Sequence, residues 1–177
     1  MSFSTPTLFI VSGPPAAGKT TLARRLAERR RALYLRLDSM EPPIVAALGD
    51  DTADIGYRVA HEVARDNLRL GHDVVADCVN DVNVTRDGWR GVAQGVGVAA
   101  VEIEILCSDP DEHRRRVENR INDIPGLRVP TWAEICAMRA DPWPRDHLTI
   151  DTAGRLIEEC FDQLMANLPP LETPKWS

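Results

Sequence analysis

The chain has 177 residues, a formal net charge of −6, 44% hydrophobic residues and 27% charged residues. This length and composition are those of one globular domain with a substantial core, and they exclude a disordered or collagen-like chain. The acidic balance argues against binding to nucleic acid or anionic lipid, because such binding depends on Lys and Arg that neutralise phosphates. We therefore expect a single domain over residues 1–177 that contacts neither nucleic acid nor a membrane.

No apolar run approaches the roughly 18 residues that a membrane-spanning helix needs, and the N-terminus lacks the basic region that begins a signal peptide. The four cysteines form no CxxC pair and show no spacing typical of a zinc site. We expect a cytoplasmic protein with reduced, structural thiols at Cys78, Cys107, Cys136 and Cys160.

Short runs of β-branched and aliphatic residues alternate with longer amphipathic stretches, which is the pattern of a parallel sheet covered by helices. In chain order, the sequence predicts strands over 7–12, 32–38, 73–79, 99–107 and 147–152. The helices predicted from apolar periodicity cover 20–30, 53–71, 85–94, 111–122 and 153–168.

The stretch 123–146 is the least regular part of the chain, with four prolines and one short possible helix near 132–138. Together with the basic helix before it, this stretch is expected to form a mobile lid over roughly 110–146. A Pro-rich tail over 169–177 is expected to follow the last helix.

The segment GPPAAGKTT, between the first predicted strand and the first predicted helix, has the spacing of a phosphate-binding loop and contains one of the two lysines of the chain. Backbone amides of such a loop form an anion-binding nest, to which the following helix adds its positive N-terminus. We expect Lys19 to reach the β- and γ-phosphates and the Thr20 hydroxyl to ligate Mg²⁺. The nucleotide-binding residues predicted in this loop are Gly13, Pro14, Pro15, Ala16, Ala17, Gly18, Lys19, Thr20 and Thr21.

Two aspartates stand near the carboxyl ends of predicted strands, the edge where ligands gather in open α/β sheets. Asp38 could accept the proton of a substrate hydroxyl and hold that hydroxyl in line with the γ-phosphate, or it could cap a turn or short helix. Asp77 could hold Mg²⁺ directly or through water, or it could be a turn residue at the strand end.

Two arginines of the predicted basic helix, Arg116 and Arg120, are four residues apart and so share one side of it. Two guanidinium groups placed in this way can act on one nucleotide, because the transition state spreads negative charge over the γ-oxygens. We expect Arg120 to be catalytic and Arg116 to bind the nucleotide. The alternative for both is a solvated face, the usual role of a charge run and the one expected for Arg114 and Arg115.

The segment DTAG at 151–154 matches the DxxG motif of small GTPases, but it follows the phosphate-binding loop by more than 130 residues. The chain also lacks an NKxD segment for reading guanine. A GTPase is therefore not expected. Instead, Asp151 or Thr152 is expected to cap the last helix, and the loop after the last strand to border the adenine.

Taken in order and spacing, the segments GPPAAGKTT, LRLDS, VVADCVN, RVENR and IDTAGR resemble the small P-loop kinases of the AAA_33 type. These kinases are relatives of polynucleotide kinase, gluconate kinase and chloramphenicol phosphotransferase, and the resemblance covers nearly the whole chain. It implies an α/β, three-layer P-loop NTPase fold with a five-stranded parallel sheet of order 2-3-1-4-5 and a helical lid. It also implies a requirement for ATP and Mg²⁺, Asp38 as general base, and a likeness of Arg116 and Arg120 to the lid arginines of nucleoside monophosphate kinases.

The expected function is transfer of the γ-phosphoryl group of ATP to a hydroxyl of a small metabolite or antibiotic, by a monomer or homodimer. The acceptor pocket is expected between the 38–58 segment and the third helix. Two alternatives remain: a regulatory module that binds ATP without transfer, and a polynucleotide 5′-hydroxyl kinase. The second is disfavoured because SMEPPIVAA, after Asp38, lacks the arginine usual in that family. The arginines available to read a charged acceptor are Arg36, Arg58, Arg86 and Arg90.

Overall fold

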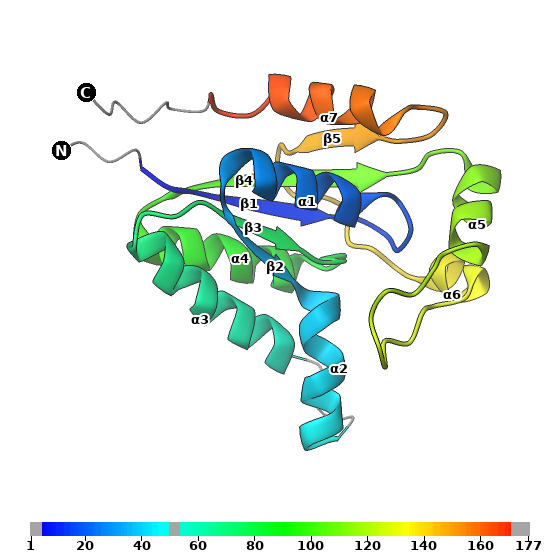
Figure 1. The fold of residues 1–177 in the computed structure, drawn as a ribbon, viewed down its shortest axis with the longest axis horizontal. Coiled ribbons are helices and arrows are strands. Elements are labelled where there is room, and N and C mark those ends of the chain that lie inside the picture. Colours follow the sequence, from blue (N-terminus) through cyan, green and yellow to red (C-terminus); the bar gives the residue numbers. More distant parts are fainter. Residues whose placement is uncertain (1–4, 50–53, 171–177) are drawn as a thin grey trace.

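The structure, a computed structural model, describes residues 5–49 and 54–170. At its centre lies a five-stranded, all-parallel sheet with the strand order β2-β3-β1-β4-β5 (Figure 1). This arrangement confirms the expected α/β P-loop NTPase fold and its strand order 2-3-1-4-5. The strands are β1 (Thr7–Ser12), β2 (Leu33–Arg36), β3 (Val74–Asp77), β4 (Ala99–Leu106) and β5 (Leu148–Asp151).

Helices cover both faces of this sheet (Figure 1). On one face, α1 (Lys19–Arg30) and α7 (Ile157–Ala166) pack over alternate residues of β1, among them Phe9. On the other face, α3 (Ile55–Arg69) and α4 (Asn83–Val96) bury the intervening residues of β1 together with Trp89. Every residue of β1 is buried, which is why this strand reads as a continuous apolar run in the sequence.

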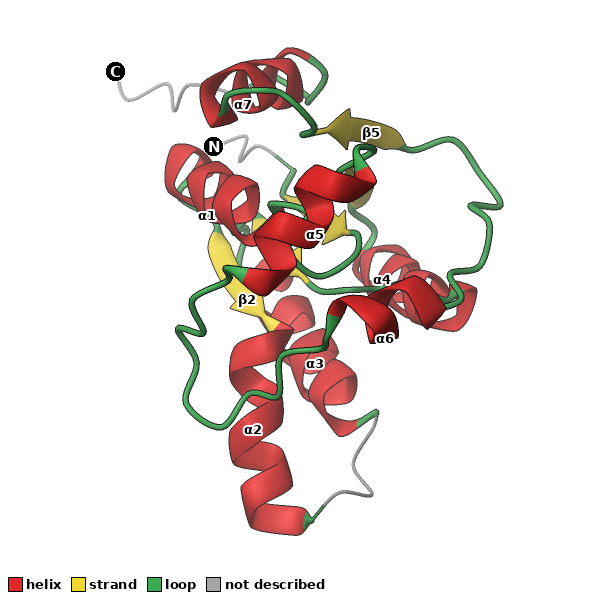
Figure 2. Ribbon diagram, turned by 90° about the vertical axis from the view of Figure 1, so that its right-hand side faces the viewer, coloured by secondary structure: helices red, strands yellow, loops and turns green. Residues whose placement is uncertain are grey.

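Two short helices, α5 (Pro110–Glu118) and α6 (Trp132–Ala137), lie beyond the carboxyl ends of the strands (Figures 1 and 2). The side chain of Asp109 caps α5 by accepting hydrogen bonds from the backbone N–H groups of Asp111 and Glu112. A capping box between Thr131 and Glu134 begins α6. The expected basic helix therefore ends at Glu118 rather than at 122, and an irregular loop joins it to α6.

The helix α2 (Leu37–Leu48) was not predicted from the sequence. The expected strand over 32–38 ends at Arg36, so Asp38 lies in the first turn of α2 and not on a strand. The capping position is Arg36, which makes no side-chain cap, so the alternative of Asp38 as a helix cap is wrong. Pro42 and Pro43 lie inside α2, and because proline has no N–H to donate, this pair obscures the helix in the sequence.

The last helix begins at Ile157 with Leu156 in the capping position, so the prediction that Asp151 or Thr152 caps it is wrong.

The expected Pro-rich tail lies outside the described residues from 171 onward. Cys78, Cys107 and Cys160 are buried free thiols, whereas Cys136 is an exposed one. Within residues 5–49 and 54–170, none of the helices combines the length and apolar character that crossing a membrane requires.

Candidate active site

The loop between β1 and α1 is held tightly against the sheet. Gly13 adopts a φ of 138°, and a Cβ atom there would lie 2.0 Å from the carbonyl oxygen of Ile105 in β4. The Gly13 N–H donates to the carbonyl of Val79, just after β3, over 3.0 Å. Gly18, with a φ of 101°, occupies the capping position of α1. The two glycines therefore allow a close approach and a turn that other residues would resist.

Lys19 is the first residue of α1 and its side chain folds back across the loop. Its ammonium donates to the carbonyl oxygen of Pro14 over 2.8 Å. Burial lowers the pKa of Lys19 below its usual value, while the carboxylates of Asp77 and Asp38 oppose this effect. Among the described residues, the carbonyl of Pro14 is the hydrogen-bond acceptor of this buried ammonium, and an incoming phosphate could replace it.

A cavity of about 930 Å³ opens beside this loop at the carboxyl ends of the strands. It is large enough for a nucleotide together with part of a second ligand. Among the residues predicted to form the site, those lining the cavity are Pro15, Ala16, Gly18, Lys19, Thr20, Thr21, Asp38, Arg116 and Arg120. Of the others, Gly13 and Pro14 line a smaller neighbouring cavity of about 150 Å³, while Ala17 and Asp77 line neither.

Asp38 and Arg120 meet across the cavity. A guanidinium nitrogen of Arg120, two residues after α5, lies 3.5 Å from a carboxylate oxygen of Asp38 in α2. The Arg120 side chain is 19% exposed and that of Asp38 is 29% exposed, so the pair is only partly screened by solvent. The structure thus brings together the expected base and the expected catalytic cation.

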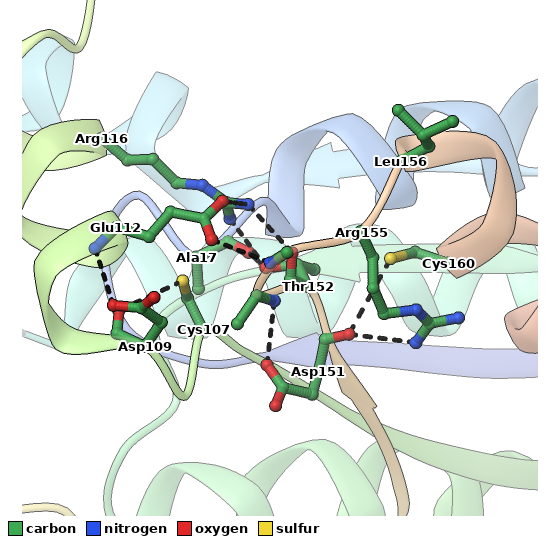
Figure 3. A network of polar contacts seen from close by, with 12 residues as sticks. Ala17, Cys107, Asp109, Glu112, Arg116, Asp151, Thr152, Arg155, Leu156 and Cys160 are labelled. Carbon is green, nitrogen blue, oxygen red and sulfur yellow. Dashed lines mark hydrogen bonds and ion pairs between the residues drawn. The ribbon is translucent and has the colours of Figure 1, made fainter.

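Arg116 connects α5 to the segment after β5 (Figure 3). Its guanidinium donates to the hydroxyl and the carbonyl oxygen of Thr152, over 2.7 and 3.0 Å, and to Glu112 over 2.6 Å. The Thr152 hydroxyl also lies 2.9 Å from the carbonyl of Ala17 in the phosphate-binding loop. Arg116 is therefore not part of a solvated face, whereas Arg114 pairs with Glu118 at the exposed surface as expected.

Asp77 is the last residue of β3 and is nearly inaccessible. Its carboxylate accepts a hydrogen bond of 2.7 Å from the hydroxyl of Tyr34 in β2. Burial, followed by the charge of Asp77, raises the pKa of Tyr34 well above its usual range, so Tyr34 remains a donor. Sequence reasoning missed Tyr34, which looks like an ordinary strand residue.

His113 is a second residue that sequence reasoning missed. It belongs to α5, is buried, and its Nε2 lies 2.8 Å from the carbonyl oxygen of Pro15 in the loop. Its ring packs edge-on against Trp132 of α6, with 5.3 Å between the centroids. His113 thereby joins both lid helices to the loop, and its place beside three arginines in the sequence gave no signal of this role.

The arginines expected to read a charged acceptor are occupied elsewhere. Arg36 lines the cavity, but both its terminal nitrogens donate to Asp123, over 2.8 and 3.0 Å. Asp123 also pairs with Arg24, and these bonds hold the pKa of its carboxyl well below its usual range, the bond to Arg36 contributing most. The remaining three, Arg58, Arg86 and Arg90, do not line the cavity.

The contacts of Arg86 hold it away from the large cavity. It is 2% exposed, donates to the carbonyls of Asn80, Asp81 and Asp141, and stacks on Trp143 with 4.0 Å to the ring centroid. It therefore clamps the start of α4 to the segment before β5. The large cavity is lined by Asp38 and Glu41 of the 38–58 segment and by the lid, but by no residue of α4, whereas Arg86 of α4 lines the smaller cavity.

Comparison with solved structures finds the same fold in proteins of low sequence identity. A protein from Chloroflexus aurantiacus J-10-fl is 23% identical, with a TM-score of 0.71, over 94% of this chain and 100% of that one. A gluconokinase from Sinorhizobium meliloti 1021 is 18% identical, with a TM-score of 0.64, over 92% of this chain and 91% of that one. The APS kinase CysC of Mycobacterium tuberculosis, in complex with AMPPNP and APS, is 19% identical, with a TM-score of 0.66, over 92% and 96% of the two chains.

At these identities the likeness shows a shared fold. A search of curated proteins gives no match. Residues 8–132, more than half of the chain, match the model of the AAA_33 family, which is described as an AAA domain. The chain therefore belongs to the AAA_33 family of AAA domains.

Proposed function

We propose that this protein is an ATP-dependent kinase that transfers the γ-phosphoryl group to a hydroxyl of a small molecule. The observation that carries the proposal is that Lys19, Asp38 and Arg120 line one cavity beside a phosphate-binding loop, with Asp38 and Arg120 in contact at 3.5 Å. The gluconokinase and the APS kinase that share the fold are kinases by name, and the second was solved with AMPPNP. These neighbours support a nucleotide and a small acceptor as the ligands.

The loop and Lys19 bind the phosphates of ATP. The loop amides and the N-terminus of α1 supply positive potential, and Lys19 exchanges its bond with the Pro14 carbonyl for one with a phosphate oxygen. Arg116 holds the segment after β5 against α5, at the end of the cavity where Thr152 and Arg155 border the nucleotide base.

The Thr20 hydroxyl and the Asp77 carboxylate are hard oxygen ligands of the kind that a magnesium ion prefers. The ion would keep much of its water shell. Thr20 lines the cavity and would hold the ion through its hydroxyl. One oxygen of the Asp77 carboxylate accepts the hydrogen bond from Tyr34, and the other would hold the ion, directly or through water. When bound, Mg²⁺ would neutralise charge on the β- and γ-phosphates.

Asp38 takes the proton of the acceptor hydroxyl as its oxygen forms a bond to the γ-phosphorus. The bond between that phosphorus and the β,γ-bridging oxygen breaks, and ADP leaves with the electron pair. For this step Arg120 turns from Asp38 to the γ-oxygens, where its charge is needed most in the transition state. The same movement frees the carboxylate to act as a base.

Calorimetry of ATP binding with and without Mg²⁺ tests the proposal, together with mass detection of products from nucleosides, sugars and aminoglycosides. Asp38→Asn should bind ATP normally but form no product, whereas Lys19→Ala should lose binding and turnover together. Asp162→Asn, on the exposed surface of α7, is the matched control and should behave as wild type. Absence of magnesium-dependent ATP binding would refute the proposal, and product formation by Asp38→Asn would refute the role of that residue.

A further inference from the structure

Glu41 lies on α2, three residues after Asp38 and therefore on the same side of the helix. Both carboxylates line the large cavity. Asp38 is paired with Arg120, but within residues 5–49 and 54–170 Glu41 makes no hydrogen bond or ion pair. A carboxylate without a partner thus stands next to the expected base.

The position of Glu41 is defined by its neighbours. It is only partly exposed, and a Cβ atom added at Gly56 of α3 would lie 3.4 Å from its Cγ. Burial raises the pKa of its carboxyl above the usual value, and the charge of Asp38 adds to this effect. Withdrawing a carboxylate from water without a compensating partner is unfavourable, so a ligand that donates a hydrogen bond would be bound strongly here.

The loop between α5 and α6 approaches α2 beside Glu41. A Cβ atom added at Gly126, in the loop between α5 and α6, would lie 3.5 Å from Pro42, the residue after Glu41. Leu127, Pro130 and Met138 add apolar surface to the same cavity. A ligand that reaches Glu41 therefore lies between α2 and the lid.

The cations at this end of the cavity already have acidic partners. Arg36 and Arg24 pair with Asp123, and Arg128 pairs with Glu134. Arg120 pairs with Asp38, and in the proposed reaction it turns to the γ-phosphate. Among the described arginines that line the cavity, Arg155 alone lacks an acidic side-chain partner, and it donates instead to Gln163 and to the carbonyls of Asp151 and Glu159. The carboxylate of Glu41 is therefore offered to an acceptor, while these arginines already have partners in place of an acceptor's carboxylate, phosphate or sulfate group.

We propose that Glu41 is a specificity-determining residue that binds an amino or hydroxyl group of the acceptor, an inference that rests on the proposed kinase function. Side chains three residues apart on a helix have Cβ atoms about 5–6 Å apart. The acceptor is therefore an amino alcohol or polyol, such as an amino sugar or aminocyclitol, whose donor group lies that far from the phosphorylated hydroxyl. Sugar acids and phosphate or sulfate esters are excluded as preferred acceptors.

The test compares acceptor-dependent ADP formation from matched probes. Glucosamine and kanamycin are the cationic probes, glucose and inositol the neutral ones, and gluconate and glucose 6-phosphate the anionic ones. Wild type should use members of the first two groups and not the third. Glu41→Gln should raise KM for the accepted probes about tenfold to a hundredfold, the effect of losing one charge-assisted hydrogen bond, without changing ATP affinity. Glu41→Lys should shift the preference towards gluconate.

Glu28→Gln, on the exposed side of α1 and away from the cavity, is the control for the substitution and should leave every KM unchanged. The inference is overturned if wild type prefers an anionic probe, if it uses none of the cationic or neutral probes, or if Glu41→Gln leaves KM unaltered. Calorimetry of ATP binding on the same samples separates the two hypotheses. If one of these outcomes is found while magnesium-dependent ATP binding is intact, the role of Glu41 alone is overturned. If wild type shows no magnesium-dependent ATP binding, the kinase proposal itself is overturned.

Discussion

The guanidinium of Arg120 lies 3.5 Å from the carboxylate of Asp38, so the expected catalytic cation and the expected general base are paired with each other. Arg120 comes from the lid and Asp38 from the start of α2, and both line the same cavity. In the proposed reaction the triphosphate would replace Asp38 as the partner of Arg120. The acceptor hydroxyl would replace Arg120 as the partner of Asp38. The ion pair therefore marks where the γ-phosphate is expected to lie.

Arg120→Ala should lower kcat about a hundredfold or more while changing ATP affinity much less, because the guanidinium is needed most in the transition state. The measurements are steady-state kinetics and ATP titration by calorimetry. Arg114→Ala is the control, since Arg114 lies in the neighbouring helix α5 but pairs with Glu118 at the surface. Equal losses in kcat and in ATP affinity for Arg120→Ala would contradict the assignment.

Gly13→Ala should destabilise the fold by about 3 kcal/mol or more, because the new Cβ would meet the Ile105 carbonyl and the positive φ is strained for alanine. Gly91→Ala makes the same chemical change in α4, where nothing lies within 4 Å of the added atom. That control should gain about 0.5–1 kcal/mol from better helix propensity. Urea unfolding measures both, and a Gly13→Ala variant as stable as wild type would show that this loop packing is wrong.

The lid should become more ordered when nucleotide binds, because closure over the γ-phosphate excludes the water that would otherwise hydrolyse it. Hydrogen exchange with and without a non-hydrolysable ATP analogue should show added protection over 110–146. The helix α3, on the face of the sheet opposite α1, should show no added protection. Unchanged exchange in the lid would rule out this movement.

His61 should make the stability of the fold depend on pH. Burial, with a smaller effect from Arg65, lowers the pKa of His61 from 6.5 to about 4, and its ring packs against Trp89 with centroids 4.4 Å apart. As the pH falls the unfolded chain takes up the proton first. The free energy of unfolding is therefore highest above the unfolded pKa and decreases as the pH drops towards the folded one.

The loss should be on the order of 1 kcal/mol, since partial exposure of the ring reduces the effect of burial. Urea unfolding at pH 7 and pH 4.5 measures it. His61→Gln should show a smaller decrease than wild type over this interval, whereas His72→Gln, at an exposed position, should show the same decrease. A His61→Gln variant with the wild-type pH dependence would exclude His61 as its source.

Much of the fold could be predicted because its signals are local. The spacing of Gly13, Gly18 and Lys19 specifies a backbone conformation, and the apolar run of β1 and the periodicity of α1 place that loop between a strand and a helix. The alternation of strands and helices indicates a parallel sheet. Each of these signals lies within a few residues of the feature that it predicts. Arg116 and Arg120 both line the cavity, but the expectation that they share one side of a helix is wrong, because α5 ends at Glu118.

The partners of the side chains were decided only by the tertiary structure. The expected strand order places β2 beside β3, but it does not reveal that Tyr34 donates to Asp77, or that α5 places His113 on Pro15. The same holds for Arg36, whose charge is matched by Asp123 in the lid. Contacts between residues distant in the chain depend on how whole elements pack, and short-range patterns do not encode that packing. For this reason the sequence alone located the phosphate-binding loop, while the position and charge of the neighbouring cavity became known only from the folded chain.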